Sequence, residues 1–285
     1  MTLRVIAGLM SVSMLVVVGG AGCSRHRSPD ATTASETTGA PPPAVPQAAR
    51  PAESGKTVIV FAGAASKPAL AELGAKYEAE TGVKVSITFG GSGAVLTQFS
   101  QEQYGDVYVP GSDDFMGKAE KKDAVLSGRT VLVYLVPAIC VAKGNPKNVR
   151  ELKDLARSDV RVVLGQPKSV CLGDIAESIL VETGLADKVK PRVASYASSC
   201  EEVLNQLVLG EADVVIGWDV FARQQPEKVE MIPLPKELAR PRNIPASVIK
   251  WSKQPEEAKA FIKYLTSAEA QGVFSKHGYT VTPPS

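Results

Sequence analysis

The chain has 285 residues, a formal net charge of +2 and 6% aromatic residues. Its charges are scattered along the sequence without a basic stripe, so little supports nucleic-acid binding. His26 and His277 are the two histidines of the sequence, which leaves no histidine cluster for a metal and no triad histidine placed by a motif.

Residues 1–23 have the features of a targeting segment. Arg4 supplies a positive charge, an apolar run extends from Val5 to Val18, and small residues lead to Cys23. We expect a lipoprotein signal peptide over 1–23 with lipidation of Cys23. A plain secretory signal is the alternative, because Gly20 stands where a leucine-like residue is usual. A transmembrane anchor is disfavoured, because the apolar run is short for a bilayer span of about 20 residues.

Residues 24–56 are rich in Ser, Thr, Ala and Pro and have almost no large apolar side chains. Such a segment cannot bury enough surface to offset the entropy of ordering. We interpret it as a disordered tether between the anchor and a folded body.

From residue 57 to the end, apolar runs alternate with helical patterns, which is typical of an α/β protein with mostly parallel sheets. The expected strands cover 57–61, 84–89, 106–109, 131–136, 139–142, 160–164, 192–196, 214–217, 229–233 and 247–249. The expected helices cover 68–80, 94–101, 113–121, 151–156, 171–183, 185–190, 199–209, 256–264 and 268–277.

Two corners of the first half share one pattern, in which an apolar run stops at small residues, presents a serine and enters a helix. These serines are Ser66 and Ser92. Such a corner directs N–H groups and a hydroxyl to one point, which suits an oxyanion. The loop around Ser92 lacks the GxxxxGK[ST] pattern of nucleotide loops and only approaches the GxSxG nucleophile elbow.

Two further helix starts lie in the second half, at 166–174 and 196–202. In the second of these, Ser199 and Glu202 form an S-x-x-E capping box. Each corner alone is an ordinary helix cap. Four of them together favour a ligand site, because the carboxyl ends of parallel strands meet at one edge of a sheet.

Three cysteines remain once Cys23 carries a lipid. An odd number in an oxidising compartment suggests one bridge and one buried thiol. Cys140 lies in an apolar run, so we expect it in the core and expect Cys171 and Cys200 to be the disulfide pair. Two unrelated buried thiols are the alternative.

The order and spacing of several motifs resemble the periplasmic molybdate-binding proteins of ABC importers. The motifs lie at 60–66, 77–85, 89–93, 106–109, 143–146, 164–167, 210–213, 258–261 and 267–271, nearly the whole folded body. The resemblance implies a two-lobed α/β fold of the type II periplasmic-binding-protein class, with two crossover strands between the lobes. It places the first lobe at 57–133 and 237–285 and the second at 134–236.

The resemblance also implies a set of ligand residues. Ser66 and Ser92 match two serines that donate hydroxyl and backbone N–H bonds from the first lobe. Leu172 matches a backbone donor of the second lobe, and Cys200, or Ser199 if the alignment shifts by one residue, matches another.

This sequence departs from the family pattern at several positions. Trp218 falls where the family usually has a ligand tyrosine; an indole N–H can donate but cannot accept, so Trp218 either reshapes the pocket or is a core aromatic. Lys67 replaces an apolar residue, and we expect it in solvent. A bridge between Cys171 and Cys200 would fix two donor loops before binding.

We therefore expect a monomeric, lipid-anchored solute-binding protein on the periplasmic or extracellular face of the bacterial cell membrane. It would bind molybdate or tungstate and deliver it to an ABC permease, with no cofactor, catalytic residue or metal beyond the oxyanion. Asp113 and Asp114 could add carboxylate ligands, but a solvated helix start is the favoured reading.

Three alternatives stay open. The first is a sulfate or phosphate receptor of the same fold. The second is a serine hydrolase that uses Ser92 or Ser66, although no base accompanies either. The third is a thiol- or metal-handling lipoprotein, although the cysteine spacing shows neither CxxC nor a zinc pattern.

Overall fold

The computed structural model describes residues 55–284. The predicted signal peptide, the lipidation site Cys23 and all but the last two residues of the predicted tether lie outside the described residues. Within the described part, no helix is both long and apolar enough to cross a membrane.

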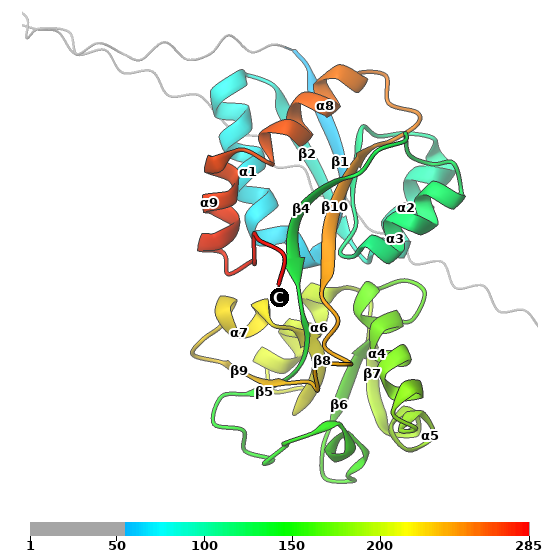
Figure 1. Ribbon diagram of the computed structural model, residues 1–285, viewed down its shortest axis with the longest axis vertical. Coiled ribbons are helices and arrows are strands. Elements are labelled where there is room, and N and C mark those ends of the chain that lie inside the picture. The colour runs from blue at the N-terminus through cyan, green and yellow to red at the C-terminus, as the bar shows by residue number, and fades with distance from the viewer. Residues whose placement is uncertain (1–54, 285) are drawn as a thin grey trace, which may run out of the picture. The chain divides into compact units, whose positions relative to one another are not determined.

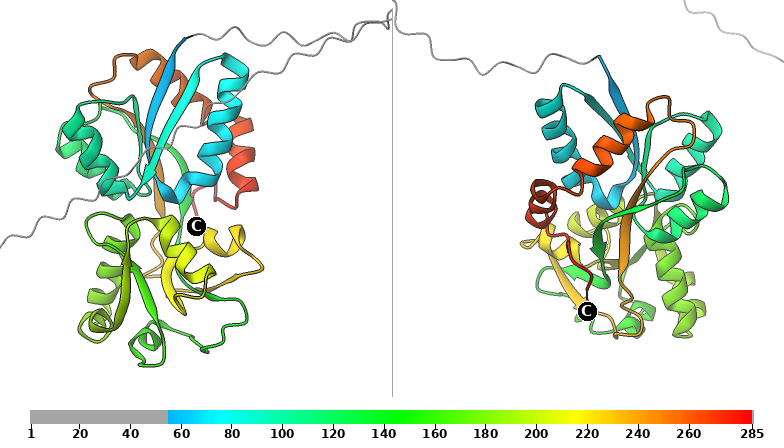
Figure 2. Two further views of the ribbon diagram at one scale, coloured as in Figure 1. Left: turned by 180° about the vertical axis from the view of Figure 1, so that it is seen from behind. Right: turned by 45° about the horizontal axis from the view of Figure 1, so that its top comes forward.

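The chain builds two sheets of five strands, each flanked by helices (Figures 1 and 2). The first has the order β2-β1-β3-β10-β4. Its strands are β1 (Thr57–Gly63), β2 (Lys84–Gly90), β3 (Val107–Val109), β4 (Thr130–Leu135) and β10 (Arg242–Val248). The helices beside it are α1 (Lys67–Thr81), α2 (Ser92–Glu102), α3 (Asp113–Lys121), α8 (Pro255–Tyr264) and α9 (Ala268–Lys276), and the short 3-10 turn η1 (Ala64–Ser66) precedes α1.

The second sheet has the order β7-β6-β8-β5-β9. Its strands are β5 (Pro137–Ala142), β6 (Val162–Gly165), β7 (Val193–Ala197), β8 (Val214–Trp218) and β9 (Val229–Pro233). Its helices are α4 (Cys171–Glu182), α5 (Ala186–Val189), α6 (Cys200–Val208) and α7 (Val220–Gln224), with 3-10 turns η2 (Leu152–Ala156) and η3 (Lys190–Arg192).

Both sheets are mixed in the same way. In the first, β1 pairs in parallel with β2 and β3, whereas β10 runs antiparallel to β3 and β4. In the second, β6 pairs in parallel with β7 and β8, whereas β5 runs antiparallel to β8 and β9. One strand per sheet is therefore reversed and the others point the same way, in agreement with the expected mostly parallel α/β fold.

The chain passes between the sheets twice, from β4 into β5 and from β9 into β10 (Figure 1). Strands β4 and β10 are antiparallel neighbours. Two crossing segments thus join the sheets, as the two-lobed fold requires. The exact lobe boundaries, 133/134 and 236/237, stay a prediction.

Most elements lie where the sequence pattern predicted them, with three differences. The last strand was predicted over 247–249 but spans Arg242–Val248, because its first half carries polar residues and a register shift next to Pro245 that hide the strand pattern. The predicted helix over 151–156 is the 3-10 turn η2. Helix α7 was not predicted, because its five residues directly follow a buried strand and are too few to show a period.

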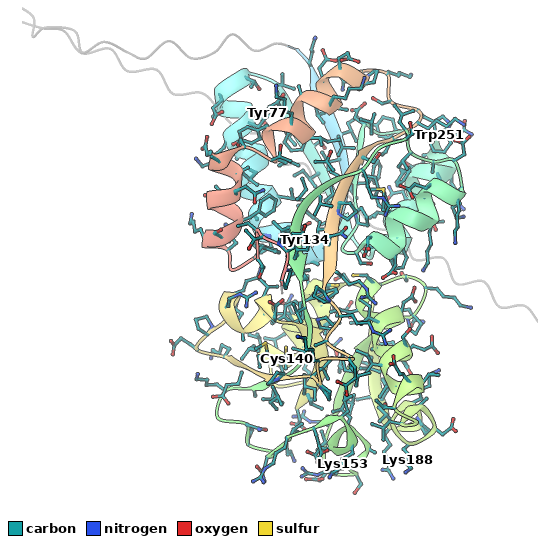
Figure 3. The ribbon with its side chains drawn as sticks, in the orientation of Figure 1. Tyr77, Tyr134, Cys140, Lys153, Lys188 and Trp251 are labelled. Carbon is teal, nitrogen blue, oxygen red and sulfur yellow. The ribbon has the colours of Figure 1, made fainter. Side chains whose placement is uncertain are left out.

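Burial of large apolar side chains holds the body together (Figure 3). The largest side chains that are fully buried include Trp218, Tyr108, Phe61 and Phe99. Phe99 on α2 stacks in a tilted arrangement between the rings of Phe61 and Tyr108, at centroid distances of 5.6 and 5.0 Å. These contacts fix α2 against β1 and β3, and so fix the helix start at Ser92.

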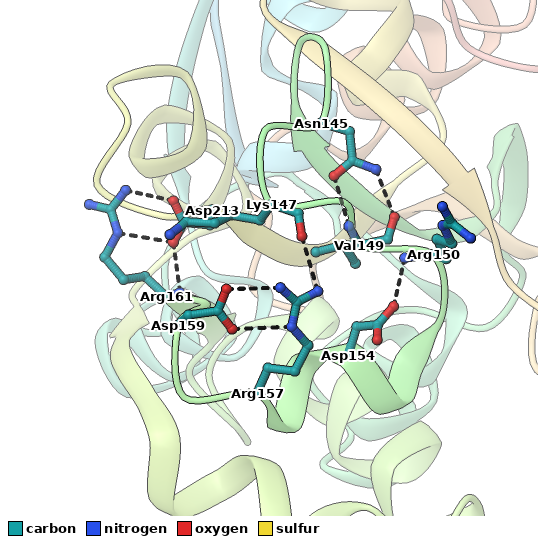
Figure 4. A network of polar contacts seen from close by, with 9 residues as sticks. All are labelled: Asn145, Lys147, Val149, Arg150, Asp154, Arg157, Asp159, Arg161 and Asp213. Carbon is teal, nitrogen blue, oxygen red and sulfur yellow. Dashed lines mark hydrogen bonds and ion pairs between the residues drawn. The ribbon is translucent and has the colours of Figure 1, made fainter.

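A polar network joins two strands of the second sheet at their amino ends (Figure 4). Arg161, just before β6, donates to the Asp213 carboxylate from its backbone N (2.8 Å), Nε (3.1 Å) and Nη2 (2.7 Å). Asp213 lies just before β8, and hydrogen bonds from Arg161 hold the pKa of its carboxyl below its usual value. Because this clamp joins the amino ends of two parallel strands, it leaves their carboxyl ends for other use.

Candidate functional site

The two predicted serines of the first sheet meet beside Gly63. Ser66 is fully buried and its Oγ donates to the Gly63 carbonyl at 3.0 Å. Ser92 is also buried, and a Cβ placed on Gly63 would lie 2.8 Å from the Ser92 Oγ. Gly63 and Gly90 are register partners at the ends of β1 and β2. Small residues at both strand ends therefore let the two corners share one buried point.

The Ser92 hydroxyl oxygen accepts one hydrogen bond from the protein. The backbone N–H of Gly111 donates to Ser92 Oγ at 2.9 Å. A hydroxyl carries one proton, so the proton of Ser92 is left for another acceptor. The Ser66 hydroxyl proton would have to turn away from Gly63 to do the same, which a freely rotating hydroxyl can do.

Gly111 belongs to a third corner that the sequence reasoning missed. It follows β3, and Ser112 after it is the N-cap of α3. Within the described residues, the fully buried Ser112 Oγ has no hydrogen-bond partner. The signal was present, because Val107–Val109 also runs into a glycine and a serine before a helix. The short strand made it less visible.

The second sheet contributes the starts of two helices. Cys171 and Leu172 begin α4, Cys200 begins α6, and all three are buried. The Sγ atoms of Cys171 and Cys200 are 3.6 Å apart. A Cβ on Gly111 would lie 2.8 Å from the Cys171 Sγ, so the third corner of the first sheet directly faces this helix start.

The pKa values of Cys171 and Cys200 are shifted by groups that lie close to the two sulfurs. The pKa of Cys171 is well above its ordinary value, because a hydrogen bond with Cys200 and burial favour its protonated form; the Ser92 hydroxyl and the Leu172 N–H act weakly against this. The pKa of Cys200 is lowered by the Cys171 thiol first, then by the Trp218 indole N–H and the Leu172 N–H. Residues from both sheets thus contact the two sulfurs.

The two sulfurs are thiols in this structure, since a disulfide would bring them to about 2.05 Å. The expected bridge between Cys171 and Cys200 therefore stays a prediction, although the structure brings the two side chains into contact. Cys140 on β5 is fully buried, as expected, and its Sγ donates to the Trp218 carbonyl at 3.6 Å. Burial raises the pKa of Cys140.

Trp218 ends β8 and is fully buried. Within the part of the chain that the structure describes, its Nε1 has no hydrogen-bond partner. A buried donor without a partner costs about 1–3 kcal/mol, so its presence calls for a reason. Its influence on Cys200 places the indole N–H at the same cluster of helix starts.

The two walls touch through main-chain groups. The Gly93 N–H of α2 donates to the Ser169 carbonyl at 2.8 Å. A Cβ on Gly91 would lie 2.7 Å from the carbonyl oxygens of both Ser169 and Ser198, and one on Gly93 would lie 2.3 Å from the Lys168 carbonyl oxygen. Glycine is needed at both places, because a side chain would collide with the facing backbone.

Charged residues predicted near the site are engaged elsewhere. The Lys67 Nζ donates to both Glu201 carboxylate oxygens at 2.8 and 2.9 Å, and its side chain is 44% exposed, so Lys67 pairs with α6 at the solvent-exposed surface. Asp114 pairs with Arg242 at 3.1 Å, and one oxygen of Asp113 lies 3.5 Å from the Asn243 amide, while its other oxygen is buried without a partner among residues 55–284. No group of three or more His, Cys, Asp or Glu able to hold a metal occurs among residues 55–284.

A cavity of about 460 Å³ lies beside the serine corners, but its charges are paired. Its lining includes Lys67, Lys276 and His277. Lys276 and His277 both contact the Glu72 carboxylate, at 2.9 and 2.8 Å. The pairing of these cations makes the cavity a poorer anion site than the buried corners.

The capping box at Ser199 is half formed. Ser199 Oγ accepts from the Glu202 N–H at 3.1 Å, as predicted, whereas the Glu202 carboxylate accepts from the N–H and hydroxyl of Ser198. Ser199 is thus occupied as the N-cap of α6, which leaves the next residue, Cys200, as the one that lies in the cluster with Cys171.

Three parallel strands of each sheet deliver one part of the site at their carboxyl ends. β1, β2 and β3 lead to Ser66, Ser92 and Gly111, and β6, β7 and β8 lead to Leu172, Cys200 and Trp218. The groups offered are hydroxyls, N–H groups and thiols, which donate hydrogen bonds and carry no fixed charge. This fold, with buried hydrogen-bond donors gathered at the carboxyl ends of strands from both sheets, is that of a two-lobed solute receptor.

The chain belongs to the family of bacterial extracellular solute-binding proteins, whose model matches residues 58–280. It is 28% identical over 232 residues to the molybdate-binding protein ModA of Mycobacterium tuberculosis, covering 81% of this chain and 87% of the relative. It is 29% identical over 237 residues to a putative ABC transporter substrate-binding lipoprotein of Bacillus subtilis, covering 82% and 90%.

Solved structures agree with this family. The substrate-binding domain of a putative molybdenum ABC transporter from Clostridium difficile superimposes with a TM-score of 0.58 at 26% identity, covering 80% of this chain and 99% of that one. The sulfate-binding protein of Mycobacterium tuberculosis superimposes with a TM-score of 0.71 at 19% identity, covering 80% and 88%, which supports the fold alone.

Proposed function

We propose that this solute-binding protein binds molybdate or tungstate between its two sheets and presents it to the membrane permease of an ABC importer. The observation that carries the proposal is the convergence of buried neutral donors from six strand ends. Among them is the Trp218 indole N–H, which has no hydrogen-bond partner among residues 55–284. The similarity to molybdate-binding and molybdenum-transporter proteins supports the choice of anion.

The assigned ligand groups are the hydroxyls of Ser66 and Ser92, the backbone N–H groups of Leu172 and Cys200, and the indole N–H of Trp218. A dianion taken out of water needs many oriented donors when no cation accompanies it, and the starts of α2, α4 and α6 add favourable dipoles. The cation next to Ser66, Lys67, is already paired with Glu201.

Such a site selects by protonation and by size. A protonated oxyanion such as hydrogen phosphate would bring a donor into a pocket that offers few acceptors, so it should bind weakly. Sulfate is fully ionised and is separated from molybdate only by cavity size. A sulfate receptor of the same fold is therefore the alternative that an experiment must exclude.

The proposal includes a cellular location. The leader ending at Cys23 and the similarity of the chain to a putative substrate-binding lipoprotein of Bacillus subtilis support a lipid anchor on the outer face of the cell membrane. The protein would act there as a monomer, and binding would favour a closed arrangement that the permease recognises. No catalytic step is assigned to it.

Calorimetric titration of residues 24–285 with molybdate, tungstate, sulfate and phosphate tests the function. We expect heat with molybdate and tungstate, weaker or no heat with sulfate and none with phosphate. Clear binding of sulfate without molybdate or tungstate would replace the assignment by the alternative.

A further inference from the structure

Two thiols occupy the wall of the proposed anion site, and no role in binding has been given to their sulfur atoms. Cys171 is 1% exposed and Cys200 is 3% exposed, and their Sγ atoms are in contact at 3.6 Å. They come from the starts of different helices, α4 and α6, so a bond between them would link two loops that both face the first sheet.

We propose that Cys171 and Cys200 form a reversible disulfide in the site wall, and that the disulfide form binds the oxyanion more tightly than the dithiol form. The first half stands on the contact between the sulfurs. The second half rests on the proposed function, because it assigns Leu172 and Trp218 as donors to the anion.

The surroundings divide the pair into an attacking and a resolving thiol. The pKa of Cys200 is lowered, chiefly by the hydrogen bond from the Cys171 thiol and against the effect of burial. Cys171 keeps its proton, since its pKa is raised by the bond to Cys200 and by burial. A low-pKa thiol beside a protonated partner is the arrangement that thiol–disulfide exchange uses.

The oxidant would be a low-molecular-weight disulfide. The Cys200 thiolate attacks one of its sulfurs, breaks its S–S bond and releases one thiolate, which takes up a proton. Cys171 then loses its proton and attacks the Cys200 sulfur, forming the protein disulfide and releasing the second thiol. Two protein thiols are thereby oxidised, and one small disulfide is reduced to two thiols.

Oxidation should improve binding because it removes a competitor for the donors. In the dithiol form, any thiolate on Cys200 would compete with the dianion for the Leu172 and Trp218 N–H groups and would repel it. A disulfide has no charge and no proton, so these donors become free. The link between α4 and α6 also lowers the ordering cost of the second wall.

Other titratable groups near the sulfurs do not produce the same effect. Tyr108 and Tyr279 interact with Cys171 and Cys200 respectively, but burial raises the pKa of both phenols, so they stay neutral. Glu201, next to Cys200, is paired with Lys67. The sulfur pair is thus the group whose charge changes at the site.

Free-thiol counting on residues 24–285 in denaturant tests the first half. After incubation with glutathione disulfide and removal of the excess, we expect a count of one, from Cys140, against three for the reduced protein. Cys140→Ala is the matched control, because it leaves only Cys171 and Cys200. Its count should fall from two free thiols in the reduced protein to zero after oxidation. Three thiols remaining after oxidation would overturn the proposal. Cys171→Ser should yield a glutathione adduct on Cys200 and no internal bridge, which mass spectrometry detects.

Calorimetry with molybdate on the two forms tests the second half. At a pH of about 8.5, near the ordinary pKa of a thiol, we expect roughly tenfold tighter binding by the disulfide form. The Cys200→Ser variant should show no change on exposure to the oxidant. Equal affinities would overturn this half. If neither form bound molybdate but the thiol count still fell to one, the disulfide would be confirmed. The proposed function would then be refuted, and with it the effect of the disulfide on binding.

Discussion

The indole N–H of Trp218 permits a test in which stability and binding respond differently. Trp218→Phe keeps an aromatic ring at the end of β8 but removes the one donor of the side chain. In the structure that donor is buried and has no partner within residues 55–284. If it waits for an anion, its loss should weaken binding without unfolding the protein.

The magnitudes follow from the burial of the side chain. Removing an unsatisfied buried donor relieves about 1–3 kcal/mol. Trp218 is 0% exposed, and the smaller ring gives up apolar contacts worth about 2 kcal/mol. The two effects oppose each other, so the free energy of unfolding should change by less than about 1 kcal/mol. A hydrogen bond to a charged ligand is worth about 1.5–3 kcal/mol, which corresponds to a roughly 10- to 150-fold loss of molybdate affinity.

The assay combines urea unfolding with calorimetric titration, and the chain supplies its own control. Trp251 is the second of the two tryptophans in the sequence and lies apart from the site, packed against the Phe61 and Phe99 cluster. Trp251→Phe should leave affinity unchanged, and molybdate should perturb the fluorescence of Trp218 alone. An affinity for molybdate within twofold of the parent protein in Trp218→Phe would refute the assignment of the indole as a ligand donor.

Three further substitutions probe other parts of the molecule. Ser92→Ala should weaken molybdate binding by roughly 10-fold or more. Ser100→Ala should not, although Ser100 is on the same helix and its buried hydroxyl lacks a partner in the described residues. Equal effects of the two substitutions in calorimetry would remove Ser92 from the site. Gly91→Ala should block close approach of the two walls, because its Cβ would lie 2.7 Å from facing carbonyls; small-angle scattering with molybdate should then show no compaction, and a compact complex would contradict this. Asp213→Asn should lower the free energy of unfolding at pH 7 by about 1.5–3 kcal/mol without changing affinity. Because Arg161 lowers the pKa of Asp213, the stabilisation by this carboxylate is present above its unfolded-state pKa and is lost as the pH falls through its folded-state pKa. Urea unfolding at several pH values should therefore show a smaller loss of unfolding free energy at acid pH in the variant.

The sequence revealed the corners at Ser66 and Ser92 because apolar strands, small residues and helix patterns follow one another closely there. It did not reveal Gly111 as a donor to Ser92, since β3 has only three residues and its corner is short. The local sequence pattern also gave no information about the partner of Lys67, because Glu201 lies 134 positions away. Long-range pairing of this kind depends on how the two sheets meet, which local pattern does not encode.

Cys171 and Cys200 show what a resemblance to a family adds and where it ends. The odd number of cysteines and the apolar setting of Cys140 suggested that they pair, and the structure brings their sulfurs to 3.6 Å. Their relation to Trp218 and Leu172 could not be predicted, because it arises where three strand ends of the second sheet converge. Positions where a chain departs from its family therefore needed the structure before a chemical role could be argued.

The selectivity of the proposed site follows from how its acceptors are already used. One lone pair of Ser92 Oγ accepts the Gly111 N–H, and the Ser169 carbonyl at the facing wall accepts the Gly93 N–H. Both bonds lie within the protein, so they remove acceptors from the pocket while leaving the Ser92 proton available. An anion that enters then meets more donors than acceptors, and a proton on the anion finds few partners. Discrimination against protonated oxyanions thus depends on hydrogen bonds within the protein that occupy acceptors before the ligand arrives.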